Sequence, residues 1–316
     1  MQNQNKNHLS EIIDFINKSE SIALLSHIGP DGDGIGSILA LKFALQSLGK
    51  NVFAVASGGI PTNYYFLNGA KSFQQKINLD KIDCIISLDV SNEERLDLYQ
   101  EKYKNKMICI DHHPHNTRFA HYNYIDLKVS STAEMVGDLI LELKIKFTKK
   151  IGEALLTGIL FDTGNLTHNF YPNTLKIIGK CVETGAKINF IKQKLHSIKD
   201  IQVFNLWGDV LSKLVVLDKN KMVYSVIDKN DLSKIKVPYQ DLNLDQLSNL
   251  LSCIDEGNSS LLLTEIKEKQ YKASLRSENF KDVDVSVIAK KFGGGGHIRA
   301  SGFKYKGEID ELLDEI

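Results

Sequence analysis

The chain has 316 residues, of which 42% are hydrophobic, and its 39 Lys plus Arg balance its 39 Asp plus Glu. This length exceeds what one small hydrophobic core usually serves, so we expect a globular protein with two domains. A formal net charge of zero argues against a protein that coats long nucleic acid through bulk electrostatics. It leaves room for a short anionic substrate that a few local charges hold.

The sequence shows no targeting or membrane signal. Residues 1–10 lack the apolar core of a secretory signal, and no apolar run approaches the ~20 residues that cross a bilayer. The cysteines are widely spaced without a C-x-x-C pair, which argues against a zinc knuckle or a redox motif; they are Cys84, Cys109, Cys181 and Cys253. We therefore expect a cytoplasmic protein.

Strands and helices alternate in the first part of the chain. Apolar runs predict strands over 21–26, 52–56, 84–88 and 107–110. Helical periodicity predicts helices over 10–18, with Ser10 as N-cap, and over 34–49, 132–143 and 151–161; residues 92–102 also have helical composition. This alternation is typical of βαβ units, so we predict an α/β domain over 1–187, with a mostly parallel sheet covered by helices on both faces.

The pattern changes after residue 187. Residues 188–214 are amphipathic, include the one tryptophan, Trp207, and predict a helical linker. From 215 to 316, runs of alternating apolar residues predict strands, which indicates a smaller α+β domain. This second domain carries a run of four glycines at 293–296.

Metal-ligand side chains follow four apolar runs of the first domain, where strands are expected to end. A lone aspartate in such a place is usually a turn or cap residue. Ligands of open α/β sheets, however, bind beyond the carboxyl ends of the strands, so four such endings together predict one shared site. The candidate residues are His27, Asp31, Asp33, Asp89, Asp111, His112, His113 and Asp162.

The glycine-rich loop that begins at His27 fits none of three common binding loops. An EF-hand would need an oxygen ligand where Ile35 stands and glutamate where Lys42 stands. A Walker loop would need Gly-Lys-Ser/Thr, and the dinucleotide pattern would need glycine in place of Ser37. A mixed carboxylate–imidazole site remains.

Mixed Asp and His ligands suit a divalent cation between hard Mg²⁺ and soft Zn²⁺, so we expect Mn²⁺, with Mg²⁺ or Co²⁺ as substitutes. The expected ligands suffice for two ions if one carboxylate bridges them; they are His27, Asp31, Asp33, Asp89, His112 and Asp162. Paired ions activate a water and neutralise the charge that develops at phosphorus. The site therefore predicts hydrolysis of a phosphorus–oxygen bond.

The chain resembles the DHH phosphoesterase superfamily, which is named for the triplet found here at 111–113. The H-x-x-x-D-x-D loop, the isolated aspartate, the triplet and the later Asp-Thr-Gly occur in family order. The resemblance implies one ion held by His27, Asp31 and Asp89, and a second held by Asp33, Asp89, His112 and Asp162. It also implies that His113 faces the scissile phosphate as a charge stabiliser or proton donor, while Asp111 orients a neighbouring histidine.

The glycine run of the second domain is followed at once by His297 and Arg299. Bare backbone N–H groups approach an anion or a flat base closely, whereas a flexible hinge, the alternative, needs no flanking His and Arg. The segment resembles the DHH-associated C-terminal domain, with its G-G-G-H-x-x-A-x-G signature. We predict substrate binding by Arg276, Gly294, Gly295, Gly296, His297 and Arg299.

Over essentially the whole chain, the resemblance is to the stand-alone bacterial nanoRNase and pAp phosphatase type. It implies hydrolysis of short oligoribonucleotides to mononucleotides and dephosphorylation of pAp, with pApA as a further candidate substrate. The expected partners are short RNA or nucleotides, without a membrane or long duplex, and a homodimer is expected. Two alternatives stay open: a manganese-dependent pyrophosphatase or exopolyphosphatase, which would need more clustered Lys and Arg, and a non-catalytic nucleotide sensor.

Overall fold

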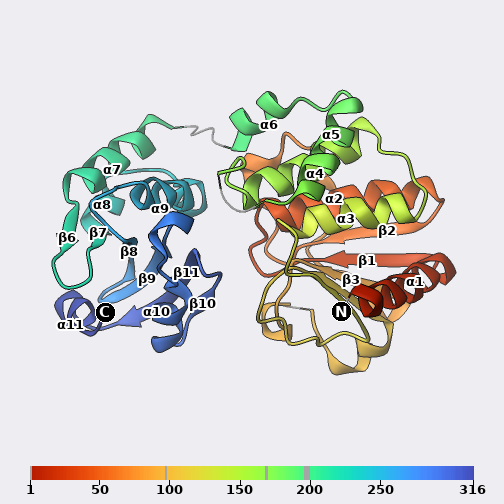
Figure 1. The fold of residues 1–316 in the computed structure, drawn as a ribbon, viewed down its shortest axis with the longest axis horizontal. Helices are drawn as coiled ribbons and strands as arrows, with labels where there is room; N and C mark the ends of the chain where they lie inside the picture. The colour runs from red at the N-terminus through yellow and green to blue at the C-terminus, as the bar shows by residue number, and fades with distance from the viewer. Residues whose placement is uncertain (1, 97, 168–169, 196–199) are drawn as a thin grey trace. The chain divides into compact units, whose positions relative to one another are not determined.

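The computed structural model describes residues 2–96, 98–167, 170–195 and 200–316. The chain forms two compact units, Met1–Ser197 and Ile198–Ile316, each with its own hydrophobic core (Figure 1). No helix among the described residues combines the length and apolar character that a membrane span requires. The two units are the α/β and α+β parts that the sequence predicts.

A parallel sheet forms the centre of the first unit. Its strands are β1 Ser21–Leu25, β2 Asn51–Val55, β3 Cys84–Leu88, β4 Met107–Asp111 and β5 Tyr122–Ile125. They lie in the order β2-β1-β3-β4-β5, and every pair of neighbours is parallel. Strand β3 is buried along its whole length, which explains its continuous apolar sequence.

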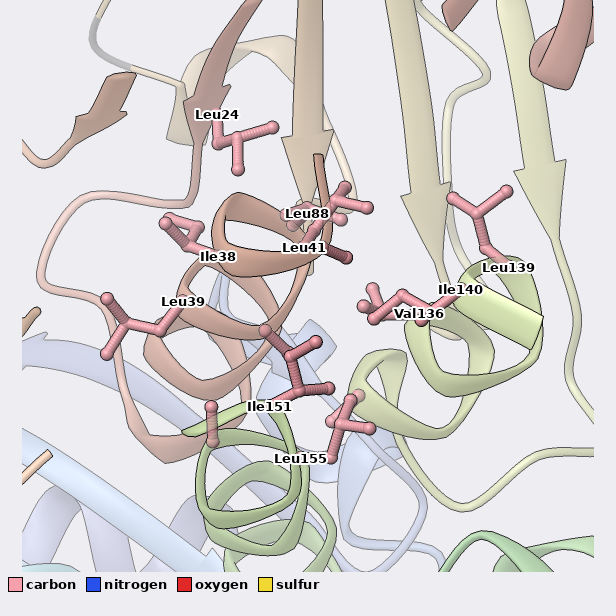
Figure 2. Close-up of a cluster of buried hydrophobic side chains, with 14 of the residues drawn as sticks. Leu24, Ile38, Leu39, Leu41, Leu88, Val136, Leu139, Ile140, Ile151 and Leu155 are labelled. Carbon is pink, nitrogen blue, oxygen red and sulfur yellow. The ribbon is translucent and has the colours of Figure 1, made fainter. Parts of the chain in front are cut away.

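Helices cover one face of this sheet. The helices of the unit are α1 Gln2–Lys18, α2 Gly32–Ser47, α3 Thr132–Glu142, α4 Lys149–Asp162, α5 Pro172–Glu183 and α6 Ile188–Leu195. Figure 2 shows side chains from β1, β3, α2, α3 and α4 that converge in the core, among them Leu24, Leu88, Ile38, Val136 and Leu155. Their burial fixes where α2 and α4 begin and end relative to the strands, and both helices carry predicted site residues.

The opposite face differs from the prediction. Short 3₁₀ turns and loops cover it, including η3 Leu79–Lys81, η4 Glu93–Arg95 and η5 Glu101–Lys106, in place of long helices. Leu79, Leu96 and Tyr103 supply buried apolar side chains from these turns. The helical composition of 92–102 is thus misleading, because tertiary burial of a few apolar side chains needs no regular helix there.

The second unit contains a mixed sheet. Its strands are β6 Val215–Leu217, β7 Met222–Ile227, β8 Ser259–Lys267, β9 Gln270–Arg276, β10 Gly295–Gly296 and β11 Ala300–Lys306. They lie in the order β10-β11-β9-β8-β7-β6, and β7 and β8 are parallel while the other neighbours are antiparallel. The helices are α7 Ile201–Ser212, α8 Lys229–Ser233, α9 Leu244–Ser252, α10 Val285–Lys291 and α11 Ile309–Glu315.

The predicted helical linker over 188–214 is two helices. Ile191 and Leu195 of α6 are buried in the core of the first unit. Val203, Leu206 and Val210 of α7 are buried in the second unit. Two separate apolar stripes, one for each core, gave the segment its continuous amphipathic pattern, and residues 196–199 between them lie outside the described part.

Gly36 allows α2 and α4 to approach closely. A Cβ at this position would lie 2.5 Å from the carbonyl oxygen of Ala154 and 2.8 Å from the amide nitrogen of Gly158. Both atoms belong to the backbone of α4, so they cannot move aside as a flexible side chain can. The crossing of these two helices therefore depends on the absence of a side chain at 36.

We expect Gly36→Ala to lower the free energy of unfolding by about 1–3 kcal/mol, because overpacking exceeds the gain in helix propensity. Gly179→Ala is the matched control: Gly179 lies inside α5 of the same unit, and a Cβ there meets nothing within 4 Å. The control should raise stability by about 0.5–1 kcal/mol. Denaturant unfolding measures both, and equal effects would contradict the close helix contact.

Candidate metal centre

The predicted site lies where the strand order of the first unit reverses. From β1 the chain goes to β2 on one side and later to β3 on the other, so the carboxyl ends of β1 and β3 flank a crevice. This is the position at which open α/β sheets bind ligands. His27 follows β1 and Asp89 follows β3, and both side chains are buried. The topology explains why these two sequence-distant residues meet.

The loop after β1 leads directly into α2, whose first turn holds two carboxylates. Asp31 is the N-cap and accepts hydrogen bonds from the amides of Asp33 at 3.0 Å and Gly34 at 3.3 Å. Asp33 is fully buried and accepts from the amides of Thr132 at 2.7 Å and Ala133 at 2.8 Å. The first turns of α2 and α3 thus both direct backbone N–H groups at these acidic side chains, which favours their charged form.

Asp89 stands at the middle of the cluster. Its backbone adopts a left-handed conformation with φ 63°, which is uncommon for a residue other than glycine and marks a constrained position. Its Oδ2 lies 3.7 Å from Nε2 of His27, and its Oδ1 lies 3.8 Å from Nε2 of His112. The two oxygens of one carboxylate therefore face two different histidines.

His112 approaches three carboxylates. Its Nε2 lies 3.0 Å from Oδ2 of Asp162, 3.8 Å from Asp89 and 3.9 Å from Asp33. His27 has a similar separation of 3.8 Å from Asp31. The structure therefore brings all six predicted metal ligands together.

Asp162 enters the cluster from a helix. It is the last residue of α4, which confirms the helix predicted over 151–161 and corrects the expectation that a strand ends before Asp162. Thr163 ends this helix, where its hydroxyl donates to the carbonyl of Ile159 at 2.6 Å. A carboxylate at a helix C-terminus faces the negative end of the helix dipole, which is unfavourable unless a cation lies nearby.

The carboxylates repel one another in the absence of a cation. Burial and the charges of Asp162 and Asp89 raise the pKa of Asp33 well above its usual range. Burial and the neighbouring aspartates likewise raise the pKa of Asp162 well above that range, and that of Asp89 moves in the same direction. Burial opposes the charge of His27, but contact with Asp31 outweighs it and raises its pKa to about 9. Positive charge is therefore favoured in this cluster.

The donor set fits divalent cations. Two ligand atoms bound to one ion at about 2.1 Å are about 3 to 4 Å apart. The His–Asp separations of 3.7 to 3.9 Å match this spacing and are too long for hydrogen bonds. Two of the groups that could hold an ion are His27, Asp31 and Asp89 on one side, and Asp33, Asp89 and His112 on the other. We conclude that the residues present fit a divalent metal site.

Asp111, the first residue of the triplet at the end of β4, is held by its own set of contacts. Asp111 is fully buried, and its Oδ1 lies 2.7 Å from Nδ1 of His113. Its Oδ2 accepts a hydrogen bond of 2.7 Å from Asn116, which also donates to the carbonyl of Val90 at 3.0 Å. Burial would raise the pKa of Asp111, but the contacts with His113 and Asn116 lower it to about 2. Asn116 has no spacing signal that sequence reasoning could have used.

Glu134 is a second residue that the sequence analysis missed, and it supports Asp33 indirectly through α3. Glu134 is fully buried, and its Oε2 accepts from the amide of Ser130 at 3.0 Å and from the hydroxyl of Thr174 at 2.7 Å. These bonds fix the start of α3, whose amides hold Asp33. The S-x-x-E spacing from Ser131 to Glu134 is that of a capping box and could have revealed this support.

The glycines of the loop make room for protein atoms. A Cβ at Gly32 would lie 2.5 Å from the ring of Phe161, and one at Gly34 would lie 2.3 Å from Oγ of Ser26. The absence of side chains at these two positions lets the start of α2 pack against Phe161 and Ser26.

The predicted substrate-binding residues gather at one corner of the second sheet. Arg276 ends β9 and pairs with Ala300 of β11, while β10 pairs with Ser301 and Gly302. His297 and Ala300 exchange backbone hydrogen bonds across a tight turn. Gly294 lies under β11, where a Cβ would meet the carbonyl oxygen of Gly302 at 2.2 Å. Gly295 and Gly296 form strand β10 and Gly294 packs against β11, so the run is part of an ordered hairpin and not a flexible hinge.

Arg299 belongs to the turn of this hairpin. Its Nη1 donates to the carbonyl of Val283 at 2.8 Å, and Nη2 lies 4.0 Å from Asp282. These contacts connect the turn to the segment before α10. Its predicted role in substrate binding stays a prediction, as do the roles of the other site residues.

Comparison with known proteins places the chain. Residues 21–159 match the DHH family, N-terminal domain, and residues 220–316 match the DHHA1 domain. The bifunctional oligoribonuclease and PAP phosphatase NrnA of Thermus thermophilus is 30% identical over 93% of this chain and 87% of the relative. The protein of the same name from Bacillus subtilis is 28% identical over 97% of each chain. An exopolyphosphatase-related protein from Bacteroides fragilis superposes with a TM-score of 0.88 and 26% identity, over 98% of this chain and 94% of that one.

The parallel sheet, with acidic and imidazole side chains at its reversal point, and the second sheet with its glycine hairpin define a phosphoesterase that uses divalent metal. The chain belongs to the DHH family, and carries the N-terminal DHH domain followed by a DHHA1 domain.

We expect Asp89→Asn to weaken Mn²⁺ binding by more than about 100-fold. Loss of a residue that only supports a ligand weakens metal binding by about 10- to 100-fold, and loss of the ligand itself should weaken it more. Isothermal titration with MnCl₂ measures this without any substrate. Asp83→Asn is the matched control, since Asp83 is an exposed carboxylate immediately before the same strand, β3. Equal Mn²⁺ affinity in both variants would exclude Asp89 as a ligand.

Proposed function

We propose that this protein hydrolyses short oligoribonucleotides to mononucleotides and removes a phosphate from pAp, with Mn²⁺ as the metal. The observation that carries the proposal is the clustering of six acidic and imidazole side chains, with Asp89 at their centre, at the reversal point of the sheet. The names of the relatives from Thermus thermophilus and Bacillus subtilis, which are similar over nearly the whole chain, support the same substrates.

Two ions are favoured by the placement of Asp89. Its oxygens face His27 on one side and His112 on the other, which is the arrangement expected of a bridging carboxylate. Asp31 completes the first group, while Asp33 and Asp162 complete the second. When bound, the ions would lower the pKa of the attacking water and neutralise charge that develops on the phosphoryl group.

His113 is proposed to contact the scissile phosphate. Burial would lower its pKa, but contact with Asp111 and the charges of Asp89 and Asp111 outweigh this and raise it. The imidazolium form is thereby favoured. We propose that Nε2, opposite the nitrogen that contacts Asp111, donates to a phosphate oxygen.

In the second unit, Arg276 and the hairpin at 294–299 are proposed to bind the end of the substrate away from the scissile bond. A guanidinium binds phosphate through parallel N–H donors, which gives orientation as well as attraction. Short substrates are favoured because recognition then rests on a few local contacts and not on a long basic surface, in keeping with the zero formal net charge.

The alternatives rank lower. A pyrophosphatase or exopolyphosphatase would need several clustered cations to bind a compact polyanion. The predicted binding residues of the second unit supply fewer lysines and arginines than that, namely Arg276 and Arg299. A sensor that has lost catalysis would be expected to lack ligands, yet all six are present and lie together. Membership of the DHH family also favours an enzyme.

The remaining expectations stay predictions. Cys84, Cys109, Cys181 and Cys253 form no disulfide, which supports a reducing compartment such as the cytoplasm. The homodimer rests on the family resemblance, and light scattering of the purified protein would test it.

With MnCl₂ supplied, a labelled trinucleotide should be converted to mononucleotides, and pAp should release phosphate, while pyrophosphate should be hydrolysed far more slowly. Chelation of the metal should stop all turnover, and Asp89→Ala should abolish it under the same conditions. Quantified product chromatography measures each reaction. Preferred hydrolysis of pyrophosphate, or full turnover by Asp89→Ala, would overturn the proposed function.

Arg276→Ala should raise the KM for a 5′-phosphorylated diribonucleotide by about 10- to 100-fold with little change in kcat, because one charge-assisted phosphate contact is lost. Lys272→Ala removes an exposed cation from the same strand, β9, and should leave KM unchanged. Steady-state kinetics separate the two variants. If they behave alike, Arg276 does not bind the substrate.

A further inference from the structure

Arg276 is fixed by contacts within its own unit before any substrate arrives. Its Nε donates to Oδ1 of Asn249 at 2.7 Å, Nη1 donates to the carbonyl of Leu275 at 3.0 Å, and Nη2 donates to Oδ1 of Asp245 at 3.3 Å. In the part of the chain that the structure describes, these three contacts do not use all N–H donors of a guanidinium. The side chain therefore retains capacity for a further acceptor.

The two contacts from α9 differ in character. Asn249 accepts a short bond from Nε, which fixes the plane of the guanidinium. Asp245 lies one turn earlier on the same helix, has a side chain 68% exposed, and makes the longer contact to Nη2. The side chain of Arg276 is only 15% exposed, so a largely buried guanidinium contacts a carboxylate that is mostly in solvent.

This exposed contact adds little to folding. An ion pair with one partner in water contributes at most about 1 kcal/mol, because solvent screens the charges. Asp245 also lies in the first turn of α9, where a carboxylate stabilises the helix slightly in any case. Stabilising the helix does not require Asp245 to contact Arg276. The contact does, however, place a carboxylate where a substrate phosphate is predicted to bind.

We propose that Asp245 is a competing counter-ion: it neutralises Arg276 in the free enzyme and must be displaced by the substrate phosphate. Burial lowers the pKa of the guanidinium, so an anionic partner is favoured at all times. A phosphate binds two N–H donors at once and carries more charge density than this single carboxylate contact, so it wins the competition. Asp245 turns toward water, and Asn249 keeps the guanidinium in its plane.

The competition sets affinity for substrate and product alike. Each phosphate that binds Arg276 must break the contact with Asp245, and each phosphate that leaves is replaced by it. Asp245 thereby raises the KM and weakens inhibition by the mononucleotide product. This inference rests on the proposed function, since it assumes that Arg276 contacts a phosphate of the substrate.

The test is Asp245→Asn, which keeps the size of the side chain and removes its charge. We expect the KM for a 5′-phosphorylated diribonucleotide to fall about two- to fivefold, the range expected from an exposed ion pair, with kcat unchanged. The inhibition constant of a mononucleotide should fall by a similar factor. If Asp245 has a purely structural role, the substitution should change the Tm and should not lower the KM at constant kcat.

Two controls make the result specific. Asp218→Asn changes the net charge equally but removes the exposed partner of Lys221, so its KM should equal that of the unaltered protein. In an Arg276→Ala background, Asp245→Asn should no longer lower the KM. An unchanged or raised KM in the folded Asp245→Asn variant overturns the competition. If Arg276→Ala also leaves KM unchanged, the proposed binding role of Arg276 has failed as well, so the two failures are distinguishable.

Discussion

The first unit is organised around the cost of placing several carboxylates in one buried crevice. Burial and the charges of neighbouring carboxylates raise the pKa of Asp33, Asp89 and Asp162. The imidazoles of His27 and His112 lie against these carboxylates. The fold offsets part of this cost with backbone amides from the first turns of α2 and α3. It increases the cost at Asp162, which ends a helix. A bound divalent cation would offset the repulsion at these positions, which supports the proposed metal site.

The clustering of the proposed ligands could be predicted from the sequence because the ends of strands are visible there. An apolar run followed by His27 or Asp89 indicates both a strand and the point at which the strand ends at the crevice. The resemblance to the family supplied the proposed assignment of the ligands to two ions. The apolar run before Asp162 suggested both a helix over 151–161 and the end of a strand, since an apolar run of this length does not distinguish the two, and the structure has the helix α4. The supporting residues were harder to find. Asn116 and Thr174 act through contacts that only the tertiary structure creates, and no local spacing announces them.

The second unit shows a similar limit. The glycine run looked like bare backbone available to a ligand, yet packing or backbone geometry requires three of its glycines, Gly293, Gly294 and Gly296. Gly293 has φ 71° and ends α10, where its amide and that of Gly294 bond back to the last turn of the helix. Gly294 lies against the backbone of β11, a strand that the sequence did not reveal because its register depends on β9. What the pattern predicted correctly was the neighbourhood of Arg276 and His297, not the reason for the glycines.

Metal binding and substrate recognition are specified by different parts of the chain. All six proposed ligands, and the amides and side chains that orient them, come from the first unit. Arg276 and its partners on α9 come wholly from the second unit. If these proposed roles hold, a change at α9 would alter how tightly a phosphate is held and would leave the geometry of the proposed metal site unchanged. The exposed contact of Asp245 is suited to such adjustment, because it can be weakened or strengthened with little effect on either core.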